Sequence, residues 1–427
     1  MSGRGTHVVE REWREATDLK PARMWLLAVL VVAAALRFWG IEVGLDGAAQ
    51  VEEAALADRV VRMMTSGDLN PHDFETPSLY LYLQLPVASV RFMAGAVAGR
   101  WSGLAQVGPG DFVLSARIVI ALFGLATVWL THQIGMRWGA RHALLAAGLV
   151  AVTPLHVRAA HAGVPAMLLA FFVALAFLLS LNAAERGTSK TFAWAGAAAG
   201  LAMATDYTGA SALLLPLLAA WMTHPARPSR LACAFVALGS AALAFLAAVP
   251  FAVLDLPAFL DGFARAVGPR AETARGWVGY LSLLEASLKW PATVILAAGF
   301  ALGAVRAVKG PGHVRWTLLV VFPVFYLWRI SGDADASSLA LLPAIAFASV
   351  LIANAVVSGI SLLRRFSIPR APRTALIVAL TVAALLPPLM ASIRLVRALR
   401  APTPPAAGSL RLDDAHIAAP SQPRDPV

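Results

Sequence analysis

The chain has 427 residues, and its mean hydropathy is +0.70. Hydrophobic residues make up 59% of it, whereas soluble domains are about half apolar. Its formal charge is +11, but the arginines are spread through short connections between apolar runs. This pattern indicates membrane topology rather than nucleic-acid binding. The single cysteine, Cys233, lies in an apolar run and excludes both a disulfide framework and a thiolate metal cluster.

Long apolar runs recur along the chain, and several approach the roughly 20 residues that a helix needs to cross a bilayer. They are rich in Leu, Ala and Val and lack the alternation of a barrel strand. We therefore expect an all-α, polytopic membrane protein with about 11–13 transmembrane helices. The runs are Met24–Gly40, Ile118–Ile134, Ala143–Leu155, Met167–Leu181, Phe192–Met222, Leu231–Val253, Pro291–Val308, Thr317–Trp328, Leu339–Val357 and Ala375–Met390.

The ends of the chain differ from its middle. Residues 1–23 carry both charges and precede a long span, which predicts a cytoplasmic segment before a retained signal anchor. Residues 24–396 form the expected transmembrane domain, with external loops at 41–77 and 254–280. Residues 397–427 are rich in Pro and Ala, which predicts a flexible tail.

The loop after the first span is unusually polar. Its stretch VEEAALADRVVRMM has helical periodicity, with Val51, Ala55, Val60, Val61 and Met64 on one side, which predicts a short amphipathic helix at the membrane surface. The following SGDLNP would end that helix, because it contains a glycine and a proline. The next stretch, PSLYLYLQ, would bring two tyrosines to the interface.

Arginine-rich connections predict which loops are cytoplasmic, and the remaining polar loops then collect on the external face. One count is uneven. Two candidate spans, Ser78–Ala98 and Val113–Ile134, lie between the external loop at 41–77 and the basic segment Arg137–His142, where only an odd number of crossings fits. Either the first candidate is interfacial, or the basic segment is external.

Several of these stretches resemble a known superfamily. The passage LRFWGIEVGL, followed by VEEAALADRVVRMMTSGDLNPHDFETPSLYLYL, resembles the first external loop of the GT-C membrane glycosyltransferases. The nearest branches are the bacterial relatives of dolichyl-phosphate-mannose–protein mannosyltransferase and of the lipid A aminoarabinose transferase. Weaker similarity in ATDYTG, PFAVLDLPAFL and LALLPAIA extends the resemblance over roughly residues 24 to 350.

The resemblance implies a glycosyltransferase of the bacterial cytoplasmic membrane, with its site on the external, periplasmic face. It would move a sugar from a polyprenyl-phosphate carrier to an external acceptor. Glu52 stands where the family has its catalytic Asp and would be the base, and Glu53 would assist in acceptor or metal binding. No metal ligands are assigned, and a divalent metal stays open. The expected substrate-binding residues are His72, Tyr80, Tyr82, Arg158, His161 and Asp206.

The chain departs from the family at three other positions. Ala166 replaces a second Asp, Asp206 replaces a Lys before the Tyr, and Ala336 falls where an Arg-Tyr pair is usual. These changes keep a second hypothesis open, a catalytically degenerate scaffold or subunit of a larger membrane complex. The external cations available to replace the lost Lys are Arg158, Arg265, Arg270, Arg275, Lys289 and Arg329.

Each candidate also has a simpler structural interpretation. Glu52 and Glu53 would lie on the solvated face of a surface helix, His72 and Asp206 would stabilise turns, and His161 would be a loop histidine. The pair Asp333 and Asp335 forms a D-x-D, a pattern too short to indicate a metal-nucleotide site.

Overall fold

The structure, a computed structural model, describes residues 23–43, 51–223, 229–268, 276–310, 312–332, 338–365 and 370–400. Within these ranges every regular element is an α-helix or a 3-10 helix, and no strand is present, as expected from the sequence. Residues 1–22 and 401–427, which include the expected cytoplasmic segment and most of the expected tail, lie outside the described residues. The proposed domain boundaries therefore stay predictions.

The first helix covers residues 23–38. The elements that follow are α2 (Val51–Ser66), α3 (Leu79–Val97), η1 (Leu104–Gln106), α4 (Gly110–Gly135), α5 (Ala140–Val152), α6 (Pro154–Ala160), α7 (Ala166–Arg186), α8 (Ser189–Thr205), η2 (Tyr207–Leu213), α9 (Leu214–Met222), α10 (Arg230–Ala248), α11 (Phe251–Leu254), α12 (Leu256–Val267), α13 (Gly276–Leu288), α14 (Trp290–Lys309), α15 (His313–Ser331), η3 (Ser338–Leu341), α16 (Leu342–Arg365) and α17 (Arg370–Leu399).

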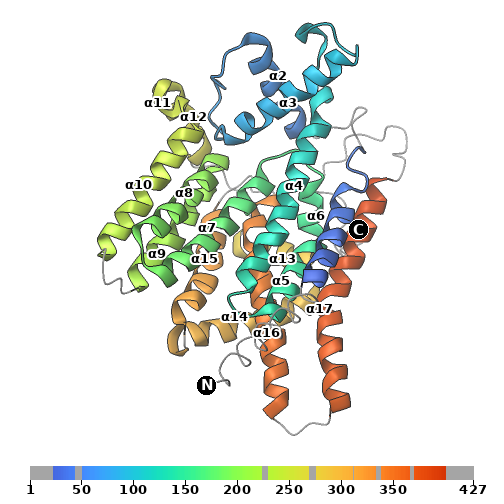
Figure 1. Ribbon diagram of the computed structural model, residues 1–427, viewed down its shortest axis with the longest axis vertical. Helices are drawn as coiled ribbons and strands as arrows, with labels where there is room; N and C mark the ends of the chain where they lie inside the picture. Colours follow the sequence, from blue (N-terminus) through green and yellow to red (C-terminus); the bar gives the residue numbers. More distant parts are fainter. Residues whose placement is uncertain are drawn as a thin grey trace, which may run out of the picture.

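The long helices run side by side as a bundle, and α2, α3, α11 and α12 gather at one of its ends (Figure 1). Two glycines of α8 let that helix approach α10 closely. A Cβ atom at Gly196 or Gly200 would overlap the carbonyl groups of Ala237 and Ala241. Small residues at these positions let the backbones of the two helices come into contact.

Seven of the described helices are long and apolar enough to cross a membrane, and the number is eight if α5 and α6, bent by 60°, form one span. This is fewer than the 11 to 13 expected. Three further helices have fewer than 18 described residues and are therefore too short to be included in this number. They are residues 23–38, Ser189–Thr205 and Tyr207–Met222, and adding these three to the eight gives 11.

The uneven count of crossings before Arg137 is explained by α3. This helix contains Gln84 and Arg91, is not among the helices apolar enough to span, and contacts α2 and α4 at the end of the bundle (Figure 1). Only α4 then crosses between the polar loop and Arg137.

The predicted surface helix is present as α2, and Gly67, with a φ of +70°, follows its last residue. Its buried side matches the expected one at Val60 and Val61 but not at Val51 and Ala55. Glu53, Leu56, Ala57, Val60, Val61 and Met63 are buried, whereas Val51 is 88% exposed. The helix is rotated because a glutamate, rather than Val51, faces the bundle.

A buried arginine of the first helix stabilises the break between α5 and α6. Pro154 has no N–H to donate to the carbonyl of Val150 one turn earlier. Arg37, which is fully buried, donates through Nη2 to that carbonyl at 3.2 Å and through Nη1 to the carbonyl of Ala151 at 3.1 Å. Its Nη2 also lies 2.9 Å from Nδ1 of His156. A cation at this position is favourable because the last carbonyls of α5 form the negative end of the helix dipole.

We predict that Arg37→Met lowers the free energy of unfolding, because the carbonyls of Val150 and Ala151 would stay buried without these donors. Each such group costs about 1–3 kcal/mol. Thermal unfolding in detergent measures the effect, with Arg62→Met as the control because that side chain is 64% exposed on α2. Equal melting temperatures for the two variants would contradict the role of Arg37.

Candidate functional site

A cavity opens at the end of the bundle that carries α2 and α12. Its volume is about 220 Å³, and it is open to solvent. Its walls come from α2, the loop before α3, the α6–α7 loop, α7, η2, α12, α15 and η3. Four of its described lining residues are charged, namely Glu52, Glu75, Asp206 and Arg329. Its volume suits a sugar-sized ligand.

Glu52 lies in the first turn of α2, and its side chain is exposed toward this cavity. No ion pair to its carboxylate is present among the described residues. The surrounding protein nevertheless removes much of the bulk water, and this desolvation is the main cause that raises the pKa of Glu52 above its ordinary value. The negative charges of Glu53 and Asp206 raise it further. A carboxylate with a raised pKa is a stronger proton acceptor once it is ionised.

Glu53 points away from the cavity and into the protein. Arg117 of α4 donates to it twice, from Nη2 to Oε2 at 2.7 Å and from Nε to Oε1 at 3.0 Å. Both side chains are buried, with exposed fractions of 1% for Glu53 and 7% for Arg117. The remaining Nη1 of Arg117 donates to the carbonyls of Ile41 (3.1 Å) and Val43 (2.7 Å), so all three guanidinium nitrogens are used.

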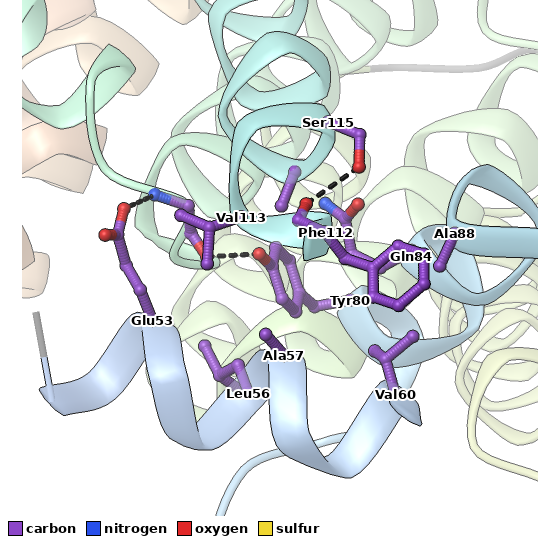
Figure 2. Close-up of a pocket in the computed structure, with 12 residues that line it drawn as sticks. Glu53, Leu56, Ala57, Val60, Tyr80, Gln84, Ala88, Phe112, Val113 and Ser115 are labelled. Carbon is purple, nitrogen blue, oxygen red and sulfur yellow. Dashed lines mark hydrogen bonds between the residues drawn. The ribbon is translucent and has the colours of Figure 1, made fainter. Parts of the chain in front are cut away.

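The same carboxylate holds the loop between α6 and α7. The main-chain N–H of Gly163 donates to Oε1 of Glu53, and the carbonyl of Gly163 accepts a hydrogen bond from the hydroxyl of Tyr80. Figure 2 shows Glu53 and Tyr80 reaching this loop from α2 and α3. We call Glu53, Arg117 and Gly163 the clamp. Val164, Pro165 and Ala166, which follow Gly163 in the chain, line the cavity. The clamp therefore fixes one wall of the cavity relative to Glu52.

Asp206 and Ala166 line the cavity together with Glu52. Asp206 occupies the turn between α8 and η2, where its Oδ1 accepts hydrogen bonds from the N–H (2.8 Å) and the hydroxyl (2.6 Å) of Thr208. Three positions that the family resemblance singled out, far apart in the sequence, are therefore brought into one cavity. The fourth, Ala336, lies outside the described residues, as do Asp333 and Asp335.

His72 and Tyr82 shape the loop between α2 and α3. His72 has a positive φ of 54°, and its Nε2 lies 2.8 Å from Oδ2 of Asp68. The hydroxyl of Tyr82 donates to the carbonyl of Leu69 at 3.0 Å. Neither residue is among those that line the cavity. Substrate contact by them stays a prediction.

Arg158 and His161 connect α6 to its neighbours. His161 is buried, with Nδ1 2.9 Å from the carbonyl of Val157 and Nε2 3.3 Å from that of Trp39. Arg158 donates to the hydroxyl of Ser338 in η3, the element that forms another wall of the cavity. Neither side chain is among those that line the cavity, and their substrate contacts likewise stay predictions.

Sequence reasoning missed two members of the clamp, Arg117 and Gly163. A signal for Arg117 was present, because an arginine at the start of a long apolar run is costly in a membrane and requires a partner. Among the external cations suggested from the sequence, Arg329 is the one that the described cavity includes; Arg270 and Arg275 lie outside the described residues.

The candidate metal ligands are the carboxylates that line the cavity. Across the described ranges, no three His, Cys, Asp or Glu side chains are arranged to hold an ion. The carboxylates of Glu52 and Asp206 alone do not make up such a set, so we derive no step through a metal.

The chain is similar to one protein family by sequence and to several solved structures by fold. The profile of the dolichyl-phosphate-mannose-protein mannosyltransferase family matches residues 104–253, and a search of curated proteins gives no match. The apo oligosaccharyltransferase of Archaeoglobus fulgidus is similar with a TM-score of 0.60 and 15% identity, over 88% of this chain and 56% of its own. ArnT from Cupriavidus metallidurans bound to undecaprenyl phosphate is similar with a TM-score of 0.57 and 17% identity, over 88% of this chain and 72% of its own.

The chain has the GT-C fold. The superfamily resemblance deduced from the polar loop is thereby confirmed, and so is the expectation of a multi-pass membrane protein. This GT-C chain spans little more than half the length of the archaeal enzyme. The matched family profile begins after α2, so the match includes Arg117, Gly163 and Asp206 but neither Glu52 nor Glu53.

We predict that Glu53→Gln destabilises the protein, because Arg117 would remain buried without its counter-ion. Removing one partner of a buried ion pair costs about 3–5 kcal/mol. Unfolding in detergent measures this, with Glu52→Gln as a matched control one residue away. The control should melt no lower than the wild type, because an ionised Glu52 is itself disfavoured by desolvation. Equal destabilisation of both variants would contradict the clamp.

Proposed function

We propose that this protein transfers a sugar from a polyprenyl-phosphate carrier to an external hydroxyl acceptor, with Glu52 as the general base. The observation that carries the proposal is the Glu52 carboxylate, whose pKa is raised and which faces a sugar-sized cavity that also contains Arg329. The GT-C fold supports this reaction class.

The reaction needs one proton acceptor and one stabilised leaving group. Glu52 takes the proton of the acceptor hydroxyl, whose oxygen forms a bond to the anomeric carbon of the sugar. The bond between that carbon and the phosphate oxygen breaks, and the lipid phosphate leaves with the electron pair. Arg329 provides positive charge for the departing phosphate. Glu53 has a positioning role, since both of its oxygens are used in the clamp.

Lipid-linked donors are supported by the structural relatives. ArnT from Cupriavidus metallidurans was crystallised with undecaprenyl phosphate, and the oligosaccharyltransferase AglB from Archaeoglobus fulgidus is known in complex with an inhibitory peptide and a dolichol-phosphate. For this chain we propose the same class of donor. The sugar and the acceptor are left unspecified.

We also propose that the cavity faces the external side of a bacterial cytoplasmic membrane. The basic segments Arg137–His142 and Arg306–Arg315 support this orientation. They lie at the ends of α4 and α14 and the starts of α5 and α15, and positively charged connections favour the cytoplasm.

A second candidate function, a non-catalytic scaffold for a membrane complex, is favoured by the charge of the cavity. Glu52, Glu75 and Asp206 give it three carboxylates against the single guanidinium of Arg329 among its described lining residues. A phosphate prefers the opposite balance. Ala166 also places a methyl group where relatives carry an acid.

We predict that Glu52→Gln abolishes turnover while leaving the fold and donor binding intact, because the amide cannot accept the proton. The assay is release of polyprenyl phosphate from a panel of polyprenyl-phosphate sugars by the full chain in nanodiscs. A general base contributes about 10²–10⁴-fold. Glu75→Gln is the matched control, since it removes a carboxylate from the same cavity without removing the base, and it should retain most of the activity.

The outcomes separate the two functions. Turnover by the wild type that is lost in Glu52→Gln and retained in Glu75→Gln supports the enzyme. Equal turnover in all three proteins eliminates Glu52 as the base. No binding and no turnover of any donor favours the scaffold, which would then be tested by identifying the proteins that co-purify with the chain.

We predict that turnover falls as the pH is lowered through a value above 4.5, the ordinary pKa of a glutamate, because the proposed base acts only when it is ionised. The sign for stability is the reverse. With a raised pKa in the folded state, Glu52 contributes stability at low pH that is lost as the pH rises through that pKa. A pH–rate profile of wild type and Glu52→Asp measures the first effect, and an activity limb at or below 4.5 would contradict it.

A further inference from the structure

At the end of the bundle opposite the cavity, two arginines stack on a pair of tryptophans. The guanidinium carbon of Arg306, in the last turn of α14, lies 4.8 Å from the ring centroid of Trp316. That of Arg315, in the first turn of α15, lies 5.7 Å from the ring centroid of Trp138. The two indole rings contact each other edge to face, with centroids 5.5 Å apart. One aromatic pair therefore carries two positive charges.

The two arginines have no counter-ion among the described residues. Arg306 donates to the hydroxyl of Ser358 at 3.1 Å, and Arg315 donates to the main-chain carbonyl of Arg137 at 2.7 Å. The neighbouring carboxylate of Glu185 is paired with Arg137 instead. Neither positive charge is neutralised by a carboxylate of the described protein, so an anion beside them would be bound favourably.

Two hydrogen-bond donors of the same group are also unused. The indole Nε1 of Trp138 and the Nε of Arg315 are shielded from solvent, and neither has a hydrogen-bond partner in the described structure. Buried donors normally have an acceptor. An oxygen-rich anion would supply acceptors as well as charge.

The position of the group points to a membrane lipid. Arg315 and Arg329 lie 14 residues apart on α15, and Arg329 lines the cavity. At 1.5 Å per residue, Arg315 is therefore about 21 Å from the cavity. On the last turns of α14, Val305 and Val308 are 62% and 80% exposed, so this side of the helix leaves apolar surface that lipid chains can cover. Tryptophans and arginines at the end of a span lie at the depth of lipid headgroups.

We propose that Arg306 and Arg315, with Trp138 and Trp316, bind the phosphate of an anionic phospholipid headgroup. Membrane topology requires only basic residues at this end of the chain. It does not require two guanidinium groups on one aromatic pair, without a carboxylate and with unused donors beside them. The site is separate from the cavity and does not depend on the proposed transfer reaction.

The test uses the full chain in detergent and native mass spectrometry to measure binding of phosphatidylglycerol against phosphatidylcholine. We expect wild type to prefer phosphatidylglycerol and Arg306→Gln/Arg315→Gln to bind it about 30-fold more weakly, from about fivefold for each arginine near an anionic headgroup. The matched control is Arg141→Gln/Arg186→Gln, which removes the same charge from exposed side chains at the same end. It should keep the wild-type preference.

Three results would overturn the proposal. The first is a wild-type chain that binds both lipids equally, a measurement that needs no variant to fold. The second is equal weakening in the two double variants, which would indicate unspecific charge attraction. The third is displacement of the lipid by an equal concentration of inorganic phosphate, which would indicate a site for a soluble anion. If Arg306→Gln/Arg315→Gln does not fold, the single variants Arg306→Gln and Arg315→Gln replace it, and each should bind phosphatidylglycerol about fivefold more weakly than the wild type.

Discussion

The ion pair between Glu53 and Arg117 determines how the end of the bundle that carries the cavity is built. Each of the two charges would be costly to bury alone. Together they are held by two direct hydrogen bonds and by three main-chain groups, the carbonyls of Ile41 and Val43 and the N–H of Gly163. The pair joins a helix outside the membrane to the start of a membrane span. Through Gly163 it also determines where the next loop lies. The wall of the cavity is thus fixed by a contact that is not itself part of the cavity.

Two adjacent glutamates have opposite environments as a result. Glu53 faces a guanidinium inside the protein, whereas Glu52, the preceding residue of the helix, faces the cavity, which two other carboxylates also line. Successive side chains of a helix point about 100° apart, so anchoring one of them sets the direction of the other. Two adjacent glutamates can in this way have different roles, one fixing the helix and the other facing the cavity.

The coarse architecture was accessible from the sequence because it depends on local signals. Apolar runs predict helices, Gly67 predicts the end of α2, and the small residues of α8 predict close packing. The predicted buried face of α2 was wrong at Val51 and Ala55. Counting apolar residues ignored the possibility that a glutamate is buried because an arginine pairs with it. Its partner is 64 residues further on, and nothing in the local periodicity marks it. The number of spans was also difficult, since helices of 16 or 17 residues lie at the limit of the length criterion.

The clamp has a consequence for biosynthesis. Glu53 leaves the ribosome 64 residues before Arg117 and 110 residues before Gly163. The carboxylate on α2 is therefore without its partner until α4 has been synthesised. An arginine entering the bilayer costs about 2.5–3.5 kcal/mol on translocon scales. The waiting carboxylate can offset part of that cost as Arg117 arrives. Only after α6 has followed can Gly163 close the third contact, so the cavity is completed late, when more than a third of the chain has been synthesised.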